Sequence, residues 1–344
     1  MNKSFLIIVG LMMLCCTTLL AQDPQFSQYY ANPLYLNPAL TGNLSNARVG
    51  VNFRQQWPSI DATFTTYTAY FDNYFADYNS GVGAILMHDR QGIAGLASTS
   101  LHLQYAYQLP LTRKITFRPG MSLGVIERRL DYSNLQFADQ FNGTGFNGIR
   151  ASSESLADMN PFYQFDLNFG GMIYTPRLFA GVSASHLNQP YFSFNENGEE
   201  RLPVKYSFHG GYRIALKADE IRNEYDRYGR ERSITPTAEF KMQKEFKQLS
   251  LGAYLTYEPL VVGLWYRGLP VTKVEGVRNK NESAVLLIGL IRGNMNIGYS
   301  FDYTLSSLSM ATGGAHEVSL SYTFDWIKSK RPPRNVRQIP CPEF

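Results

Sequence analysis

The sequence contains few cysteines: three in 344 residues, at positions 15, 16 and 341. Two of them lie in the apolar stretch that opens the chain. If that stretch is removed, Cys341 is the only thiol and no internal disulfide can form. A chain of this length without disulfides depends on its own core or on the closure of a barrel.

Long apolar runs and a strong net charge are also missing. A membrane-spanning helix needs roughly 18–20 apolar residues in a row, and no segment after the first twenty residues reaches that length. Charged residues make up 17% of the chain, and the formal net charge is +4 without a dense basic stripe. This composition argues against a nucleic-acid partner.

Motifs for catalysis and metal binding are scarce. The five histidines (88, 102, 186, 209 and 316) never lie three or four residues apart, so a helical zinc motif is absent. A Gly-x-Ser-x-Gly elbow is absent as well. Residues 143–148 spell Gly-x-Gly-x-x-Gly, but no helical pattern follows, and we interpret them as a flexible outer loop. We expect no enzymatic activity, no cofactor and no metal, unless distant side chains converge.

Residues 1–21 have the pattern of a secretory signal peptide. A single lysine precedes an apolar run over residues 5–20, and Ala21 is a small residue before the expected cleavage point. Cys15 and Cys16 raise the alternative of a lipoprotein, but the residues before them are larger than a lipidation site requires. We therefore predict an exported protein.

Aromatic residues and strict alternation are abundant. The chain has 23 Tyr and 22 Phe, and residues 296–303 and 317–326 alternate between apolar and polar side chains. A period of two predicts β-strands with one apolar and one polar face. Tilted strands that cross a bilayer need roughly 9–11 residues, and their outer faces are apolar and rich in aromatics. The pattern is typical of a transmembrane barrel.

Similar patterns recur along the chain and predict an all-β fold: a transmembrane antiparallel β-barrel of about 14 strands over residues 47–326. The expected strands are 48–56, 65–74, 81–88, 99–109, 115–128, 161–174, 178–187, 204–216, 234–245, 248–257, 260–268, 283–292, 294–303 and 315–326. The strand at 283–292 fits least well, because it is apolar on both faces.

Connections alternate between tight and long. Tight connections fall at 110–114, 175–177, 258–259 and 293–294, and long polar ones at 129–160, 188–203, 268–282 and 304–314. Outer-membrane barrels have short periplasmic turns and long outer loops. An even number of strands then places both termini in the periplasm. Residues 217–233 form a long charged connection on the expected periplasmic side, either an insertion for a periplasmic partner or a solvated loop.

The tail, residues 327–344, is basic and rich in proline, which excludes a helix. An extended segment of this kind either docks on another protein or is a frayed terminus, expected here in the periplasm. The candidate partner-binding residues are Arg331, Arg334, Arg337, Cys341 and Phe344.

Several carboxylates lie on the polar faces of expected strands: Asp166, Asp302, Glu317 and Asp325. We expect them to face the lumen, hydrogen-bonded or paired with Arg213 and Arg267, rather than to act as an acid/base pair.

The most specific motif follows the signal peptide. Residues 23–39 contain Asp-Pro-Gln-Phe-Ser-Gln-Tyr-Tyr and then Asn-Pro-Leu-Tyr-Leu-Asn-Pro-Ala, and this segment resembles the N-terminus of the PorP/SprF family. Further matches are Gly42 and residues 52–57, 265–267, 298–303 and 315–317. The likeness runs from about residue 22 to residue 326. The final Pro-Cys-Pro-Glu-Phe and the 217–233 connection resemble the gliding, SprF-like branch.

The resemblance implies an outer-membrane barrel of the type IX secretion and gliding motility system of Bacteroidetes-type bacteria. It implies two kinds of protein partner besides the lipid bilayer. One is a very large repetitive surface adhesin, whose C-terminal sorting domain such barrels receive and hold. The other is the set of periplasmic secretion or gliding components. Residues 22–46, here called the lead-in, are then either a plug or strap in or under the barrel, or an element that recognises a partner.

Two other functions are compatible with the residues alone. An even-stranded barrel can be a channel or small-molecule transporter without a dedicated protein partner. Alternation does not separate lipid from a packed core, so a soluble exported β-sandwich or propeller also fits.

Overall fold

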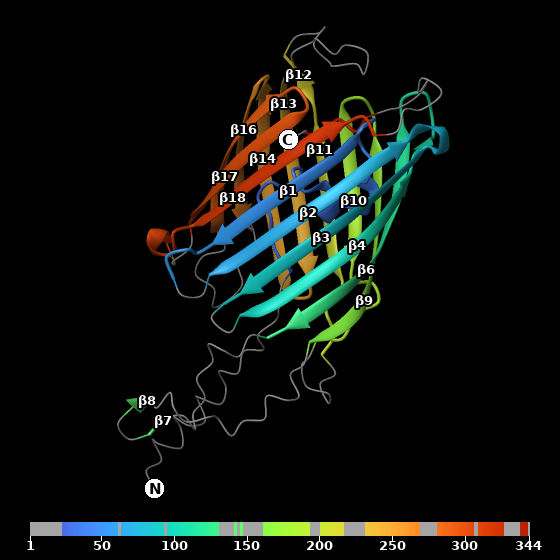
Figure 1. The fold of residues 1–344 in the computed structure, drawn as a ribbon. Coiled ribbons are helices and arrows are strands. Elements are labelled where there is room, and N and C mark those ends of the chain that lie inside the picture. Colours follow the sequence, from blue (N-terminus) through green and yellow to red (C-terminus); the bar gives the residue numbers. More distant parts are fainter. Residues whose placement is uncertain are drawn as a thin grey trace.

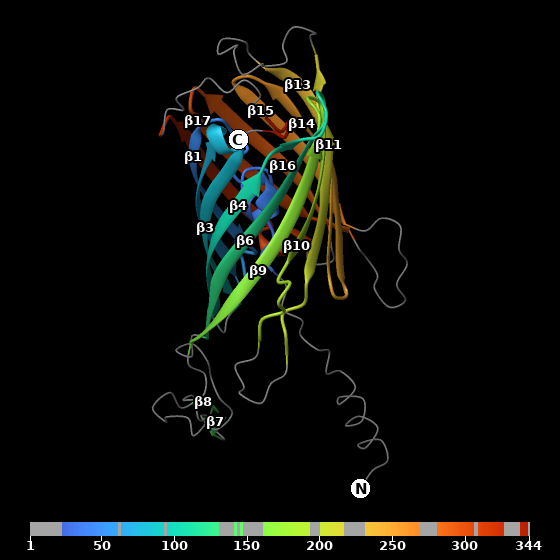
Figure 2. The same cartoon turned by 90° about the vertical axis from the view of Figure 1, so that its right-hand side faces the viewer.

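The computed structural model describes residues 23–60, 63–92, 95–130, 141–142, 145–146, 161–192, 200–216, 231–268, 281–305, 309–326 and 338–342. In this part of the chain, fourteen long strands form one antiparallel sheet that closes on itself (Figures 1 and 2). The first strand pairs with the last over its whole length, Ala47 opposite Phe324 and Gln56 opposite Ala315, so the barrel is closed.

The strands follow one another around the barrel in chain order. They are β1 (Ala47–Gln56), β2 (Phe64–Phe75), β3 (Ser80–Gln91), β4 (Leu96–Tyr107), β6 (Thr116–Arg129), β9 (Phe162–Tyr174), β10 (Leu178–Ser185), β11 (Lys205–Tyr212), β13 (Arg232–Gln243), β14 (Phe246–Tyr257), β15 (Leu260–Gly268), β16 (Asn281–Arg292), β17 (Met295–Thr304) and β18 (Ala315–Phe324). Each matches one expected strand to within a few residues, so the predicted fourteen-stranded barrel is confirmed.

Four two-residue strands add little to the wall. Two of them, β5 (Leu109–Pro110) and β12 (Ile214–Ala215), extend the sheet beside β6 and β13. The other two, β7 (Phe141–Asn142) and β8 (Gly145–Phe146), pair only with each other. They contain part of the Gly-x-Gly-x-x-Gly stretch, and the remainder of that stretch lies outside the described residues.

Alternation along each strand separates an apolar outer wall from a polar lumen. On β4, Leu101 and Leu103 are 52% and 65% exposed on the outside, whereas His102 and Gln104 between them are buried inside. Lipid-facing apolar residues and lumen-facing polar residues are the arrangement of a transmembrane barrel. Within the described residues no helix is long and apolar enough to span a membrane.

Strand β16 is apolar on both faces for a local reason. Its outward residues Leu286 and Ile288 are exposed, as on other strands. Its inward residues Val285 and Leu287 are buried in an apolar cluster inside the barrel, which includes Trp265 of β15. The lumen therefore has its own small hydrophobic core, and β16 supplies part of it.

The two ends of the barrel differ. Strand pairing places the connections after β6, β10, β15 and β17, the four expected long loops, at one end, here called the long-loop end. The expected tight turns after β9, β14 and β16 lie at the opposite, short-turn end, with the start of β1 and the end of β18. The connection after β12, which contains residues 217–230, also leaves the short-turn end.

The described lead-in, residues 23–46, lies inside the barrel (Figures 1 and 2). Its prolines start two short helical turns, α2 (Pro33–Leu36) and η1 (Pro38–Leu40), because proline is favoured at the first helical position. Between them the Asn37 side chain caps η1 by accepting a hydrogen bond from the Ala39 N–H at 2.9 Å. Most of the lead-in is buried, so it fills the lumen.

Candidate functional site: a lumen filled by the chain's own termini

One wall carboxylate clamps the start of the lead-in. Glu317 of β18 accepts hydrogen bonds from the backbone N–H groups of Ser27, at 2.7 Å, and Gln28, at 3.2 Å. The Ser27 hydroxyl donates to Asp302 of β17 at 2.7 Å. An anion that accepts backbone N–H bonds away from water forms stronger bonds than a neutral acceptor, so this clamp fixes the lead-in to the wall.

Two arginines from other strands complete the clamp. Arg54 of β1 bonds to Asp302 at 2.8 Å and to Glu317 at 3.1 Å, and Arg267 of β15 bonds to Asp302 at 3.0 Å. All four side chains are buried. Two cations and two anions balance in charge, which offsets the desolvation of each group. The expected pairing of Asp302 with Arg267 is confirmed.

Aromatic residues of the lead-in form the core of the lumen. Tyr29 packs edge-on against Trp265 with ring centroids 6.3 Å apart, and Tyr30 packs against Phe179 at 5.7 Å. The Trp265 indole N–H donates to the Tyr29 hydroxyl at 3.1 Å. Buried aromatic pairs of this geometry contribute roughly 0.5–1.5 kcal/mol each beyond the burial of their area.

Three wall glycines let the second half of the lead-in approach the sheet. A Cβ atom on Gly120 would lie 2.3 Å from the backbone nitrogen of Ala39, and one on Gly81 would lie 2.0 Å from the Thr41 carbonyl oxygen. A Cβ atom on Gly170 would meet the Asn37 side chain. The lead-in backbone therefore occupies space that any larger residue at these wall positions would need.

The lead-in leaves through the short-turn end, held by charged wall residues. Arg118 of β6 donates to the carbonyl oxygens of Thr41 and Gly42, the latter at 2.7 Å. The Gly42 N–H donates to Asp72 of β2 at 2.7 Å, and Asp72 also pairs with Arg48 at 2.9 Å. The lead-in thus has polar contacts with the wall from one end of the barrel to the other.

The tail returns to the same lumen. Ile339 and Cys341 are buried with Tyr30 in the apolar core, and the Asn43 amide lies 3.7 Å from the Cys341 sulfur. Cys341 forms no disulfide. Of the expected partner-binding residues, the structure describes only Cys341; the other four (Arg331, Arg334, Arg337 and Phe344) lie outside the described residues.

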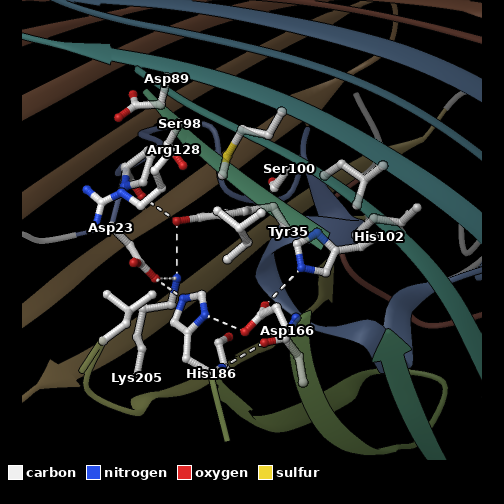
Figure 3. Close-up of a pocket in the computed structure, with 18 of the residues that line it drawn as sticks. Asp23, Tyr35, Asp89, Ser98, Ser100, His102, Arg128, Asp166, His186 and Lys205 are labelled. Carbon is white, nitrogen blue, oxygen red and sulfur yellow. Dashed lines mark hydrogen bonds and ion pairs between the residues drawn. The ribbon is translucent and has the colours of Figure 1, made fainter. Parts of the chain in front are cut away.

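A row of hydrogen-bonded ionisable groups lines a cavity of about 100 Å³ at the long-loop end (Figure 3). His102 and His186 both bond to Asp166, at 2.9 and 2.8 Å. The other ring nitrogen of His186 lies 2.9 Å from Asp23, which pairs with Lys205 at 2.7 Å. The sequence did not reveal this convergence, because the histidines lie on β4 and after β10, far apart in the chain.

The environment shifts the two groups of this row that lie outside the strands. Burial alone would lower the pKa of His186, but the carboxylates of Asp23 and Asp166 outweigh it and raise the pKa to about 9. Burial alone would raise the pKa of Asp23, but the charges of His186 and Lys205 hold it well below its usual value. At neutral pH the link is therefore an ion pair.

No group of three or more His, Cys, Asp or Glu side chains suited to a metal ion occurs in the described ranges.

Two residues expected in the lumen from the sequence lie elsewhere. Asp325 accepts a hydrogen bond from Asn46 at 2.8 Å on the surface. Arg213 lies 3.6 Å from Glu231 at the short-turn end, rather than on a lumen carboxylate.

The described parts of the two terminal segments contact the barrel near different ends of the lumen. Asp23 is held at the long-loop end by Lys205 and His186, whereas Cys341 contacts Asn43, which bonds to Arg48 near the short-turn end. The expectation that both termini lie on the periplasmic side of the membrane stays a prediction. The number of strands fixes only the ends of the wall, not a segment that threads the lumen.

One known family matches a stretch of the chain that includes both the lead-in and most of the wall. The family model for the type IX secretion system membrane protein PorP/SprF matches residues 18–322. No curated protein matches the chain.

Solved structures resemble the fold. The toluene transporter TbuX of Ralstonia pickettii has a TM-score of 0.52 and 9% identity, over 86% of this chain and 94% of that one. The P. putida toluene transporter TodX has a TM-score of 0.44 and 11% identity, over 85% and 93% of the two chains. At 9% identity, the match to TbuX supports the barrel fold alone.

Proposed function

Because this chain belongs to the PorP/SprF family of type IX secretion system membrane proteins, we propose that it is a partner-holding barrel of that system. Its location is the outer membrane, as its fold and family indicate. In this proposal the barrel anchors, or helps to export, a large surface adhesin by its C-terminal sorting domain. It also links that cargo to periplasmic secretion or gliding components. The role requires no catalysis.

The filled lumen is the observation that carries the proposal. A channel needs a continuous water-filled path, whereas here the lead-in is clamped to Glu317 near one end and to Asp72 near the other. The tail adds Ile339 and Cys341 to the core between them. Buried polar groups that are hydrogen-bonded in this way make a structure rigid and do not form a path for ions. A barrel closed by its own chain is suited to presenting a fixed surface to partners.

The two ends offer surfaces to different compartments. The long loops lie at one end and are suited to hold cargo at the cell surface. Strands β12 and β18 end at the other end of the barrel, where periplasmic components would bind in this proposal. In this arrangement Asp23 lies at the outer end and Cys341 nearer the periplasmic end.

The test is recovery of partners from the native membrane. The barrel would carry an affinity tag in the loop at 188–203 and be purified in mild detergent, with bound proteins identified by mass spectrometry. We expect one very large repetitive surface protein together with periplasmic secretion or gliding components. Recovery of the barrel alone, from cells that display such a protein, would contradict the proposal.

A small-molecule channel is the second candidate, favoured only by the transmembrane barrel itself. It predicts single-channel conductance in a planar bilayer for the intact protein, altered by Asp166→Asn in the lumen. The anchoring proposal predicts a silent intact barrel. A variant that lacks residues 23–46 serves as the positive control, because emptying a fourteen-stranded barrel should open a path.

A further inference from the structure

The cavity at the long-loop end contains a buried cation that forms no direct ion pair with any described residue. Arg128 of β6 is 7% exposed, and its Nε has no hydrogen-bond partner. One Nη donates a long hydrogen bond, 3.4 Å, to the Phe192 carbonyl oxygen. No ion pair joins Arg128 to any carboxylate among the described residues. The carboxylates of Asp23 and Asp89 act on the Arg128 charge only from beyond ion-pair distance, so the guanidinium can still form a direct pair with the carboxylate of a ligand.

The Arg128 guanidinium is held in a fixed orientation. Its Cζ lies 3.3 Å from the centroid of the Phe192 ring, which packs against one face of the planar group. Arginine stacked in this way keeps its N–H donors in the plane, where they suit an incoming carboxylate. The Nε of Arg128 is enclosed and has no hydrogen-bond partner among the described residues, so a ligand carboxylate would pair with the guanidinium through its Nη groups.

The other charges around the cavity have partners, and they restrict the ligand. Asp23 is paired with Lys205, and Asp89 accepts hydrogen bonds from Thr66 and Gln91, each at 2.6 Å. Figure 3 shows Asp89 on the same side of the cavity as Arg128. A dianion such as a phosphate monoester would be repelled by Asp89, whereas a singly charged carboxylate would be less so. Asp89 also offers an acceptor to an N–H group of the ligand.

We propose that this cavity binds the side-chain carboxylate of an acidic residue on a partner polypeptide. Arg128 pairs with the carboxylate, Asp89 accepts a nearby backbone N–H, and Ile85 and Ile126 contact the methylene groups. The volume of about 100 Å³ has room for a short side chain. Tyr35 of the lead-in also lines the cavity, which lies at the long-loop end, the end that faces an outer partner in the proposed function.

Small model compounds test directly whether the cavity binds a side-chain carboxylate. Thermal unfolding of the purified barrel in detergent would be followed with N-acetyl-L-glutamate N′-methylamide, the matching glutamine compound, free L-glutamate and inorganic phosphate. We expect the blocked glutamate to raise the Tm and the blocked glutamine to leave it unchanged. A rise in Tm with phosphate alone or with free glutamate alone would overturn the inference that the cavity binds a carboxylate of a polypeptide. An unchanged Tm with every compound would overturn it as well.

Variants locate the binding. Arg128→Gln should weaken the affinity for the blocked glutamate about tenfold or more, since one charge-assisted pair is lost. Asp89→Asn should weaken it less. Arg213→Gln, at the short-turn end, is the matched control and should bind normally. Each variant is first checked for an SDS-resistant folded band. If Arg128→Gln does not fold, Arg128→Lys keeps the charge and should bind weakly. Unchanged binding in a folded Arg128 variant would overturn the inference.

The identity of the partner rests on the proposed function, and a second readout separates the two. Recovery of the large surface protein would be compared between the native barrel and Arg128→Gln. Recovery by the native barrel with a reduced yield for the variant supports the inference. Equal yields would overturn this site while the anchoring role stands. Absence of the partner from both would overturn the anchoring role, and the model compounds would still decide the chemistry of the cavity.

Discussion

The Nε2 of His186 lies 2.9 Å from a carboxylate oxygen of Asp23, which ties the first described residue of the lead-in to the connection after β10. Lys205 of β11 holds the same carboxylate from the other side at 2.7 Å. Because Lys205 lies on a wall strand and His186 directly follows one, charge fixes the outer end of the lead-in to the barrel. The following predictions test this tether and the contacts deeper in the lumen.

The first prediction concerns pH. The pKa of His186 is raised from 6.5 to about 9 in the folded protein. Its stabilisation is therefore fully present below about pH 6.5 and is lost as the pH rises through about 9. The pKa of Asp23 is lowered, so its contribution is present above its ordinary value and is lost in acid as the pH falls through the folded pKa. We therefore expect the contacts of Asp23 with His186 and Lys205 to be most stable above the ordinary pKa of an aspartate and below about pH 6.5.

Protease sensitivity of the lead-in, measured from pH 5 to pH 10, checks the prediction. Cleavage near residue 23 should rise through about pH 9 in the native barrel, whereas His186→Gln should be sensitive throughout. A surface histidine variant, His316→Gln on β18, is the control and should follow the native profile. A native profile in His186→Gln would show that the pair does not hold the lead-in.

The second prediction uses the close approach of the lead-in to a wall glycine. Gly120→Val places side-chain atoms where the backbone of Ala39 now lies, 2.3 Å from the position of a Cβ atom. Overpacking of this kind costs roughly 1–3 kcal/mol, and the lead-in can move whereas the hydrogen-bonded wall cannot. We therefore expect a folded barrel with a displaced lead-in.

Conductance and protease sensitivity would both report the displacement. Gly171→Val on β9 is the matched control, because a Cβ atom there meets only the Phe117 ring at an ordinary 3.4 Å. The control should remain silent and resistant, and Gly120→Val should conduct. Gly120→Val could instead lose its SDS-resistant folded band while the control keeps it. In that case Gly120 would be needed for folding of the barrel wall and not for placement of the lead-in.

Several parts of this structure could be predicted from the sequence. Alternation identified the wall because lipid and the lumen impose opposite requirements on successive residues, as at Leu103 and Gln104. Alternation also identified Asp302 as a lumen residue, because it lies on a polar strand face, and Arg267 was one of its expected partners. The fourteen strands followed from this local signal, which repeats in every strand.

What fills the lumen was harder to predict. The path of the lead-in depends on contacts between residues far apart in the chain, such as Ser27 with Glu317. Likewise, His102 and His186 meet at Asp166 only because the barrel closes, and no spacing in the sequence encodes that meeting. The apolar inner face of β16 was the available signal: an apolar patch inside a polar lumen requires an apolar occupant.

The third prediction tests the clamp at Ser27. Glu317→Gln removes one of two anions that neutralise Arg54 and Arg267, and leaves buried positive charge in excess. Breaking a buried pair by removing one partner typically costs about 3–5 kcal/mol. We expect a clear loss of thermal stability, measured as disappearance of the SDS-resistant folded band. Asp325→Asn, an equivalent change at a surface hydrogen bond, should cost less than about 1 kcal/mol. Equal effects of the two changes would assign no special role to the clamp.

The last prediction concerns Cys341, the only cysteine beyond the expected signal peptide. Its side chain is 6% exposed inside the lumen, packed beside Tyr30 and 3.7 Å from the Asn43 amide. A maleimide reagent reaches such a thiol only when the tail leaves the lumen, so labelling of the native barrel should be slow and denaturant should make it rapid.

A Cys341→Ser, Glu245→Cys double variant is the control. It places the thiol in an exposed turn and should label at once. Since the lead-in packs against the tail, Gly120→Val should label faster than the native barrel. Rapid labelling of the native barrel would mean that the tail does not stay in the lumen, and the core would then be formed by the lead-in alone.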